Sequence, residues 1–202
     1  MLTYSELYSW FGFNQELFHL INGFHNPTID QLMLLVTTLG HPQLYPFYIM
    51  IVLVLKWYKP NAIPQANIVT FSVSYIATSV LIVPYLKSSF DLPRPLNVLG
   101  EQNITIIGNP DLIHSFPSGH SAFAILMAAS LFTGSSPLGK VILLLFAILV
   151  CVSRISVGAH FPADIIGSLV IALPTVFIVR HTLDMGRRSA GKDHNYTLEE
   201  SN

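Results

Sequence analysis

Three cationic side chains, Lys87, Arg94 and Arg154, stand beside apolar stretches of the chain. A phosphate monoester carries about −1.5 to −2 charges at neutral pH, and more negative charge builds on its equatorial oxygens during transfer. The planar guanidinium groups of the two arginines match pairs of phosphate oxygens, whereas the lysine supplies a compact point charge. The three residues therefore suit a phosphate site, although they could instead snorkel from apolar segments to lipid headgroups.

The motif Pro117-Ser118-Gly119-His120 comes directly before an apolar run of helical character. It would place Ser118 and Gly119 at a helix N-terminus, where free backbone N–H groups and the helix dipole attract anions. Gly119 would let a phosphate approach the backbone closely. Because Pro-Ser-Gly is also ordinary turn and capping chemistry, the anion-binding interpretation depends on His120 and on the other motifs.

His160 and Asp164 are four residues apart, and Pro162 stands between them where a first helical turn would begin. Residues four apart share a helix face, so the carboxylate can hold one imidazole nitrogen. That contact would fix the tautomer, leave the other nitrogen as a nucleophile and stabilise positive charge that develops on attack. Such a pair can also be structural, but ionisable residues at the membrane favour a functional role.

The composition indicates which elements must position these residues. Only 10% of the 202 residues are charged and 51% are apolar, whereas soluble domains carry about a quarter charged residues. A bilayer core roughly 30 Å thick is crossed by about 20 mostly apolar helical residues. We therefore expect an all-α integral membrane helical bundle of about five to six transmembrane helices. Five apolar stretches support it, at residues 34–57, 66–86, 120–133, 141–152 and 162–179.

We expect one membrane domain over residues 1–202. It would consist of an N-terminal interfacial helix (residues 1–28), a catalytic membrane bundle (29–183) and a polar cytoplasmic tail (184–202). Aromatic bulk at helical spacing around Trp10 and Phe18 suits the headgroup boundary, but the same pattern fits an amphipathic helix packed on protein.

The distribution of basic residues predicts the orientation of the chain. With five spans, the loops over residues 87–119 and 154–161 lie on the same side of the membrane. That side holds three of the ten Lys and Arg residues. The opposite side holds the other seven: Lys56, Lys59, Lys140, Arg180, Arg187, Arg188 and Lys192. By the positive-inside rule the face with seven charges is cytoplasmic and the face with the motifs is extracytoplasmic.

Other classes of partner find little support. A net charge of −1 provides no basic field for nucleic acid. The acidic residues are scattered, and no His, Cys or Asp cluster has metal-ligand spacing, so we expect no metal. Of the remaining histidines, His114 lies close to the second motif and could touch substrate, whereas His41 is assigned to a Gly-His-Pro break that bends the first apolar stretch or marks its entry into the membrane.

The three motifs occur in order between Lys87 and Asp164 and together resemble the three-part signature of the type-2 phosphatidic acid phosphatase superfamily, whose relatives include vanadium haloperoxidases and glucose-6-phosphatase. The resemblance implies that His160 attacks phosphorus, that Asp164 orients it and that His120 protonates the leaving group. It implies no cofactor. It also implies phosphate binding by Lys87, Arg94, Ser118, Gly119 and Arg154.

The implied activity is that of a membrane-bound, metal-independent lipid phosphatase that hydrolyses a phosphomonoester or diphosphate through a phosphohistidine. Candidate substrates are undecaprenyl diphosphate, phosphatidylglycerol phosphate, lipid A 1-phosphate and phosphatidate. The small size resembles bacterial members, which implies the bacterial inner (plasma) membrane. The long, apolar connection over residues 88–116 could act as a lid on lipid.

Two alternatives remain. A lipid-to-lipid phosphotransferase would use the same phosphohistidine and differ only in the acceptor. In a membrane transporter we would expect charged residues inside the spans, whereas the ionisable residues of the motifs cluster at predicted span ends.

Overall fold

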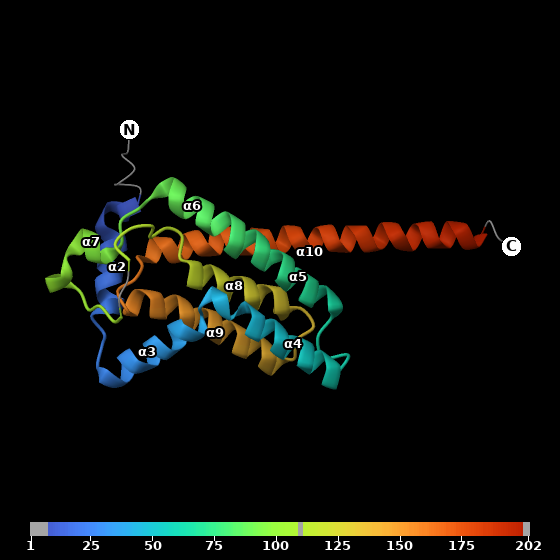
Figure 1. Cartoon of the computed structure of the whole chain (residues 1–202), viewed down its shortest axis with the longest axis horizontal. Helices are drawn as coiled ribbons and strands as arrows, with labels where there is room; N and C mark the ends of the chain where they lie inside the picture. The colour runs from blue at the N-terminus through green and yellow to red at the C-terminus, as the bar shows by residue number, and fades with distance from the viewer. Residues whose placement is uncertain (1–7, 109–110, 200–202) are drawn as a thin grey trace.

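The structure, a computed structural model, describes residues 8–108 and 111–199, and every regular element in these ranges is a helix (Figure 1). In chain order the helices begin with η1 (Trp10–Gly12), α2 (Phe13–Asn22), α3 (Pro27–Leu39), η2 (Pro42–Leu44), α4 (Tyr45–Tyr58), α5 (Gln65–Tyr75), the π-helical η3 (Ile76–Ile82) and α6 (Val83–Phe90). After α6 the chain continues with α7 (Pro95–Leu99), η4 (Glu101–Asn103), α8 (Gly119–Phe132), α9 (Pro137–Ser156) and α10 (Pro162–Glu199). The expected all-α class is confirmed.

Three of the described helical segments are long and apolar enough to cross a membrane, and they lie within Gln65–Leu99, Pro137–Ser156 and Pro162–Arg188. A fourth span results when α3 and α4 are counted together, because they form an apolar pair bent by 55° at a short break. Helix α8 is apolar but has 14 residues, about 21 Å at a rise of 1.5 Å per residue. The five to six helices expected thus correspond to three or four candidate spans and the shorter α8.

Proline and a side-chain cap mark the start of two of these helices. Pro27 and Pro137 occupy the first turns of α3 and α9. A backbone N–H at these positions would have no hydrogen-bond partner within the helix, so proline, which lacks this N–H, is tolerated there. The preceding side chains accept hydrogen bonds from the free N–H groups of the first turn, Asn26 from Ile29 N at 2.9 Å and Ser136 from Gly139 N at 3.1 Å. The boundaries of both helices therefore follow from local sequence.

Helix α8 lies in the middle of the bundle, packed against α5, α9 and α10 (Figure 1). Its side chains from Ser121 to Ala128 are all buried. Phe123 packs in one cluster with Phe71 of α5 and Val176 of α10. Because protein rather than lipid surrounds α8, its length does not need to match the thickness of the bilayer.

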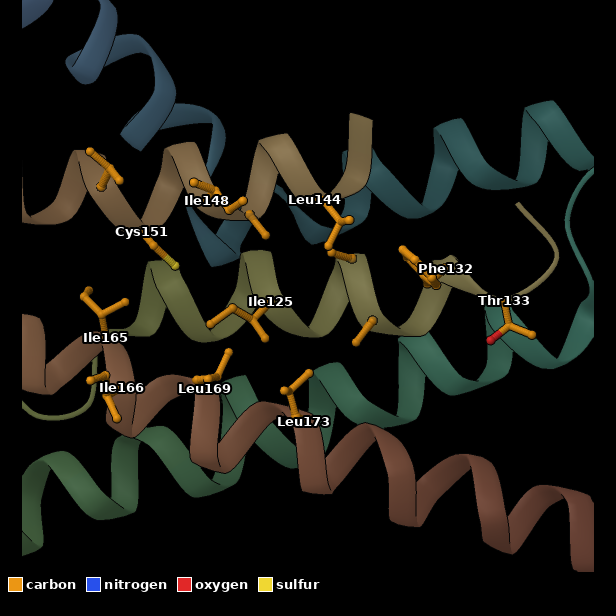
Figure 2. Close-up of a pocket in the computed structure, with 14 residues that line it drawn as sticks. Ile125, Phe132, Thr133, Leu144, Ile148, Cys151, Ile165, Ile166, Leu169 and Leu173 are labelled. Carbon is orange, nitrogen blue, oxygen red and sulfur yellow. The ribbon is translucent and has the colours of Figure 1, made fainter. Parts of the chain in front are cut away.

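An apolar cavity of about 610 Å³ lies between α8, α9 and α10 (Figure 2). Ile125, Ile148 and Leu169, one from each helix, are among the side chains that line it. Exposed aliphatic residues that do not line the cavity, such as Leu138 and Val170, lie on the same helices. Exposed carbon on this scale suits a surface that the hydrocarbon of a bilayer surrounds.

Helix α2 packs on protein with one face and exposes apolar side chains on the other. Phe18 is fully buried with Ile155 and Phe161 at the ends of α9 and α10. Phe13 and Leu20 of the same helix are exposed. Of the two interpretations of the N-terminal segment, the structure therefore supports packing on protein, and its position at the headgroup boundary stays a prediction.

Helix α10 continues beyond the other helices as far as Glu199 (Figure 1). The segment expected as a polar tail, residues 184–202, thus prolongs the last helix in its described part, and residues 200–202 lie outside the described residues. Its cytoplasmic location remains a prediction.

Candidate active site

The residues of all three motifs gather at one end of the bundle, the end that also carries α2 and α7 (Figure 1). Each belongs to a helix end or to the segment that joins two helix ends, which is why residues far apart in the sequence converge. Lys87 lies in the last turn of α6, Arg94 is the N-cap of α7, Ser118 is the N-cap of α8, Gly119 and His120 open α8, Arg154 lies in the last turn of α9, His160 precedes α10 and Asp164 is in the first turn of α10.

His160 and Asp164 form a buried pair. The imidazole Nδ1 lies 3.1 Å from Asp164 Oδ2, and the two side chains are 2% and 0% exposed. The same oxygen accepts hydrogen bonds from Phe161 N at 3.0 Å and from the Ser115 hydroxyl. The other oxygen, Oδ1, accepts from the Tyr8 hydroxyl at 2.7 Å. A carboxylate held by so many donors is fixed in place, and since Nδ1 faces it, the nitrogen left to react is Nε2.

The segment that carries His160 turns sharply after α9. The N–H groups of Ala159 and His160 both donate to the Arg154 carbonyl at 3.1 Å. Gly158 has a φ of +76°, and a Cβ there would lie 2.5 Å from the Thr105 carbonyl oxygen. A glycine is therefore required both by the backbone conformation and by the close approach of the 88–116 connection.

His160 lies between α9 and α10, outside the candidate spans. Burial, together with the cations of Arg154, Arg94 and Lys87, lowers the pKa of His160 well below its usual range, and a backbone hydrogen bond with Ser115 opposes this shift. The imidazole is consequently neutral at physiological pH. A neutral ring has a lone pair available for attack.

Arg154 is 9% exposed and has an unmet donor. Its Nη1 donates to the Thr37 hydroxyl on α3, 117 positions away. Among the described residues, none accepts a hydrogen bond from its buried Nε. Since a buried polar group without a partner is costly, a guanidinium with a free N–H is suited to an anion that completes its hydrogen bonds.

Arg94 and Lys87 are held by the connection between α6 and α8. Arg94 Nε donates to the Ile113 carbonyl at 3.0 Å, and its Nη2 lies 3.2 Å from the exposed Asp111 carboxylate. Lys87 Nζ donates to the His114 carbonyl. The connection expected as a lid therefore fixes two of the three cations.

The N-terminus of α8 is tied to α10. Ser118 caps α8 by accepting from Ser121 N at 3.4 Å, and its own N–H donates to the Asp164 carbonyl at 3.3 Å. A Cβ on Gly119 would meet only Val83, at 3.8 Å, so the backbone there is open. Just before this motif the Phe116 ring packs on Gly167, where a Cβ would lie 2.1 Å from the ring. Only glycine at that position lets the second motif lie against α10.

Several polar residues of the site have no counterpart in the sequence motifs. They are Tyr8 and Ser115 on the Asp164 carboxylate, Thr37 on Arg154, and His41, whose ring centroid lies 4.8 Å from that of His120 at an interplanar angle of 85°. The one signal that could have pointed to His41 is a histidine at a helix break within an apolar stretch.

His114 does not contact the His160–Asp164 pair in any hydrogen bond of the structure. Its Nδ1 lies 3.0 Å from Asp91 Oδ1, and both residues have positive φ angles, +58° and +45°. Among the described residues, no group of three or more His, Cys, Asp or Glu side chains lies close enough to hold a metal ion.

Two undecaprenyl-diphosphatases are similar to this chain over most of its length. Undecaprenyl-diphosphatase BcrC of Bacillus subtilis is 29% identical over 177 residues, which are 86% of each chain. The undecaprenyl-diphosphatase of Sulfolobus acidocaldarius is 29% identical over 158 residues, 77% of this chain and 71% of that one.

Two solved structures share the fold. The crystal structure of Aquifex aeolicus LpxE superposes with a TM-score of 0.72 at 28% identity, over 83% of this chain and 94% of that one. The first transmembrane PAP2-type phosphatidylglycerolphosphate phosphatase from Bacillus subtilis superposes with a TM-score of 0.69 at 20% identity, over 88% and 87% of the two chains. Residues 68–188, more than half of the 202 residues, match the PAP2 superfamily, and the chain belongs to this superfamily.

Proposed function

We propose that this PAP2-type membrane lipid phosphatase transfers the terminal phosphate of a lipid diphosphate to His160 and then to water. The observation that carries the proposal is the buried His160–Asp164 pair, with Nδ1 and Oδ2 3.1 Å apart, among three cations of which one, Arg154, retains an unmet donor.

In the first step Nε2 of His160 attacks phosphorus and the bond from phosphorus to the leaving oxygen breaks. Positive charge develops on the imidazole, and the Asp164 carboxylate stabilises it through Nδ1. Lys87, Arg94 and Arg154 offset the charge on the equatorial oxygens, with the N–H groups at Ser118 and Gly119. His120, which takes up a proton as the anionic phosphate binds beside it, gives this proton to the leaving oxygen.

In the second step water attacks the phosphohistidine. His120, now neutral, takes a proton from the water, the bond between Nε2 and phosphorus breaks, and inorganic phosphate leaves. The neutral His160 that results is ready for another cycle. Each group returns to its starting protonation state and no electron is transferred, so the reaction needs no redox cofactor.

The choice of undecaprenyl diphosphate as first substrate is supported by the names of two relatives, each similar over most of the chain. Phosphatidylglycerol phosphate, lipid A 1-phosphate and phosphatidate share the same chemistry, a phosphate at the end of a bilayer-embedded tail. A site at one end of a membrane bundle suits such substrates, because the tail stays in the hydrocarbon while the headgroup reaches the cations.

We also propose that the site faces the extracytoplasmic side of the bacterial inner membrane. Support comes from Arg180, Arg187 and Arg188, which lie in the part of α10 far from the site. With Cys151 replaced by serine, single cysteines at Gln102 and Asp184 can be labelled with an impermeant thiol reagent in intact cells. We expect labelling at position 102 and not at 184, and the reverse pattern would contradict the orientation.

The activity is tested by phosphate release from these four lipids in detergent, with and without EDTA. We expect undecaprenyl diphosphate to be hydrolysed fastest, EDTA to have no effect and His160→Ala to be inactive. His181→Ala is the matched control, since this exposed histidine of α10 stacks on Phe177, far along α10 from the site. Release from none of the lipids, or loss of activity in EDTA that a divalent ion restores, would contradict the proposal.

A further inference from the structure

The break between α3 and α4 borders the general acid. A cavity of about 280 Å³ opens there, lined by Thr37, Thr38, His41, Gln43, Leu44 and His120. All but the last of these residues precede the region that matches the superfamily, residues 68–188. The cavity is therefore lined mainly by residues outside the three sequence motifs.

His41 presents a hydrogen-bond donor in this cavity. As the N-cap of η2 its Nδ1 accepts from Gln43 N at 3.2 Å. A backbone N–H can only donate, so the neutral ring must carry its proton on Nε2. The ring meets His120 edge to face, with centroids 4.8 Å apart. The break thus both bends the chain and brings a second imidazole ring to the side of His120.

Thr37 links the cavity to the phosphate site. Its side chain lines the cavity, and its hydroxyl accepts a hydrogen bond from Nη1 of Arg154. The cavity is therefore separated by one side chain, Thr37, from a cation proposed to hold the transferred phosphate.

Phosphoryl transfer places the attacking and leaving atoms roughly in line, on opposite sides of phosphorus. His160 is 2% exposed and is not among the residues that line the cavity. The cavity lies beside His120 instead. Since His120 is proposed to protonate the leaving oxygen and lines the cavity, the leaving group of the reaction proposed above belongs there.

We propose that the cavity is a subsite for the phosphate that stays on the lipid, and that His41 Nε2–H donates to it, so that the enzyme prefers a lipid diphosphate to the monophosphate of the same lipid. This inference rests on the proposed function. The bond between the terminal phosphorus and the bridging oxygen breaks, and the oxygen departs with the lipid monophosphate. His41 transfers no proton and acts only as a hydrogen-bond donor.

The chemistry of the two leaving groups explains why His41 favours the diphosphate. A monophosphate ester releases an alkoxide, which depends strongly on the proton of His120. A diphosphate releases a phosphate, whose second pKa is about 6, so it needs less protonation. The negative charge that develops on this departing phosphate must, however, be stabilised within a confined site. A fixed hydrogen-bond donor such as His41 contributes most where such charge develops.

The test compares the wild type and His41→Ala on polyprenyl diphosphate and polyprenyl monophosphate of equal chain length. We expect the ratio of kcat/KM for diphosphate to that for monophosphate to fall about tenfold or more, the range for a lost hydrogen bond to a charged group. An equal loss on both substrates would overturn the inference.

Two further variants separate the donor from the helix cap. His41→Asn keeps an oxygen that can cap η2 but cannot reach as far as Nε2, so its ratio should fall as in His41→Ala. His41→Gln places an amide N–H near the position of Nε2 and should restore much of the ratio. His181→Ala should keep the ratio of the wild type. If His41→Asn keeps it too, the role is structural and the inference fails, whereas hydrolysis of neither substrate by the wild type would refute the proposed function itself.

Discussion

The Tyr8 hydroxyl donates a 2.7 Å hydrogen bond to Oδ1 of Asp164, a residue 156 positions further along the chain. The contact is supported by Asn14 of α2, whose Oδ1 accepts from Ala163 N at 2.9 Å in the same turn of α10. The N-terminal helix therefore holds the start of α10 and the carboxylate that faces His160. The observed role of this helix is thus to position a residue of the site, and its location at the headgroup boundary remains a prediction.

Removal of the Tyr8 hydroxyl should impair chemistry more than binding. In Tyr8→Phe the Asp164 carboxylate keeps its other donors but loses the one on Oδ1, so it orients His160 less well. We expect kcat to fall about tenfold, the lower range for a hydrogen bond to a charged group, with KM little changed. Steady-state kinetics measure both constants. Tyr85→Phe, at an exposed site on α6, should match the wild type, and a rise in KM at constant kcat would contradict a positioning role.

The lowered pKa of His160 predicts activity under mildly acidic conditions. A pKa below the usual value of about 6.5 means that the ring is still neutral, and so nucleophilic, at pH 6. The acid limb of kcat/KM, which reports the free enzyme, should therefore lie below pH 6.5. Unfolding raises the pKa of His160 back to its usual value, so its contribution to stability is present above pH 6.5 and is lost as the pH falls through the lowered pKa.

Thermal unfolding of the wild type and His160→Ala between pH 7.5 and 5 checks the same shift. The wild type should lose stability relative to the variant as the pH falls below 6.5, because only the unfolded wild type takes up the additional proton. An acid limb of kcat/KM above pH 6.5, or parallel stability curves for the two proteins, would show that His160 is not held neutral.

Arg154 should not tolerate lysine. An ammonium cannot both donate to Thr37 and present a second fixed N–H to an oxygen, as the guanidinium can. We expect Arg154→Lys to lower kcat/KM about 100-fold, as for the loss of one transition-state donor, and to weaken inhibition by vanadate in parallel. Arg187→Lys, at an exposed position of α10, is the control. Unaltered vanadate inhibition in Arg154→Lys would show that this arginine does not bind the phosphate.

Local spacing was sufficient to predict much of the candidate site. The four-residue separation of His160 and Asp164 predicts a shared helix face, and their side chains are in contact at 3.1 Å. The motifs converge because each stands at a helix end on the same predicted side of the membrane. The sequence likewise predicts the starts of α8 and α10 close to Gly119 and Pro162.

The remaining contacts depend on tertiary structure that no local pattern contains. Tyr8 and Thr37 reach Asp164 and Arg154 across 156 and 117 positions. Such pairs arise only when α2 and α3 pack against the ends of α9 and α10. The length of α8 could not be predicted from sequence for a related reason. Hydropathy identifies spans whose length matches the thickness of the bilayer, whereas a helix surrounded by protein can be shorter.

The proton role of His120 can be separated from its other effects by the choice of leaving group. His120→Ala should hydrolyse lipid monophosphates poorly, because an alkoxide departs slowly without a proton. An ester of p-nitrophenol has a leaving group that needs little protonation, so it should partly rescue this variant. Comparison of the two rates in His120→Ala and in the wild type is the measurement. An equal loss of activity on both esters in His120→Ala would show that His120 does not transfer a proton to the leaving group.

The central claim, nucleophilic attack by His160, is tested most directly by trapping the covalent intermediate. Wild-type enzyme mixed with substrate labelled in the terminal phosphate and quenched after a few milliseconds should carry label that is stable in base and released in acid, as a phosphohistidine is. The label should be absent from His160→Ala, present in His120→Ala given a p-nitrophenyl ester, and located by peptide mapping at position 160. A labelled adduct that persists in His160→Ala would contradict the account.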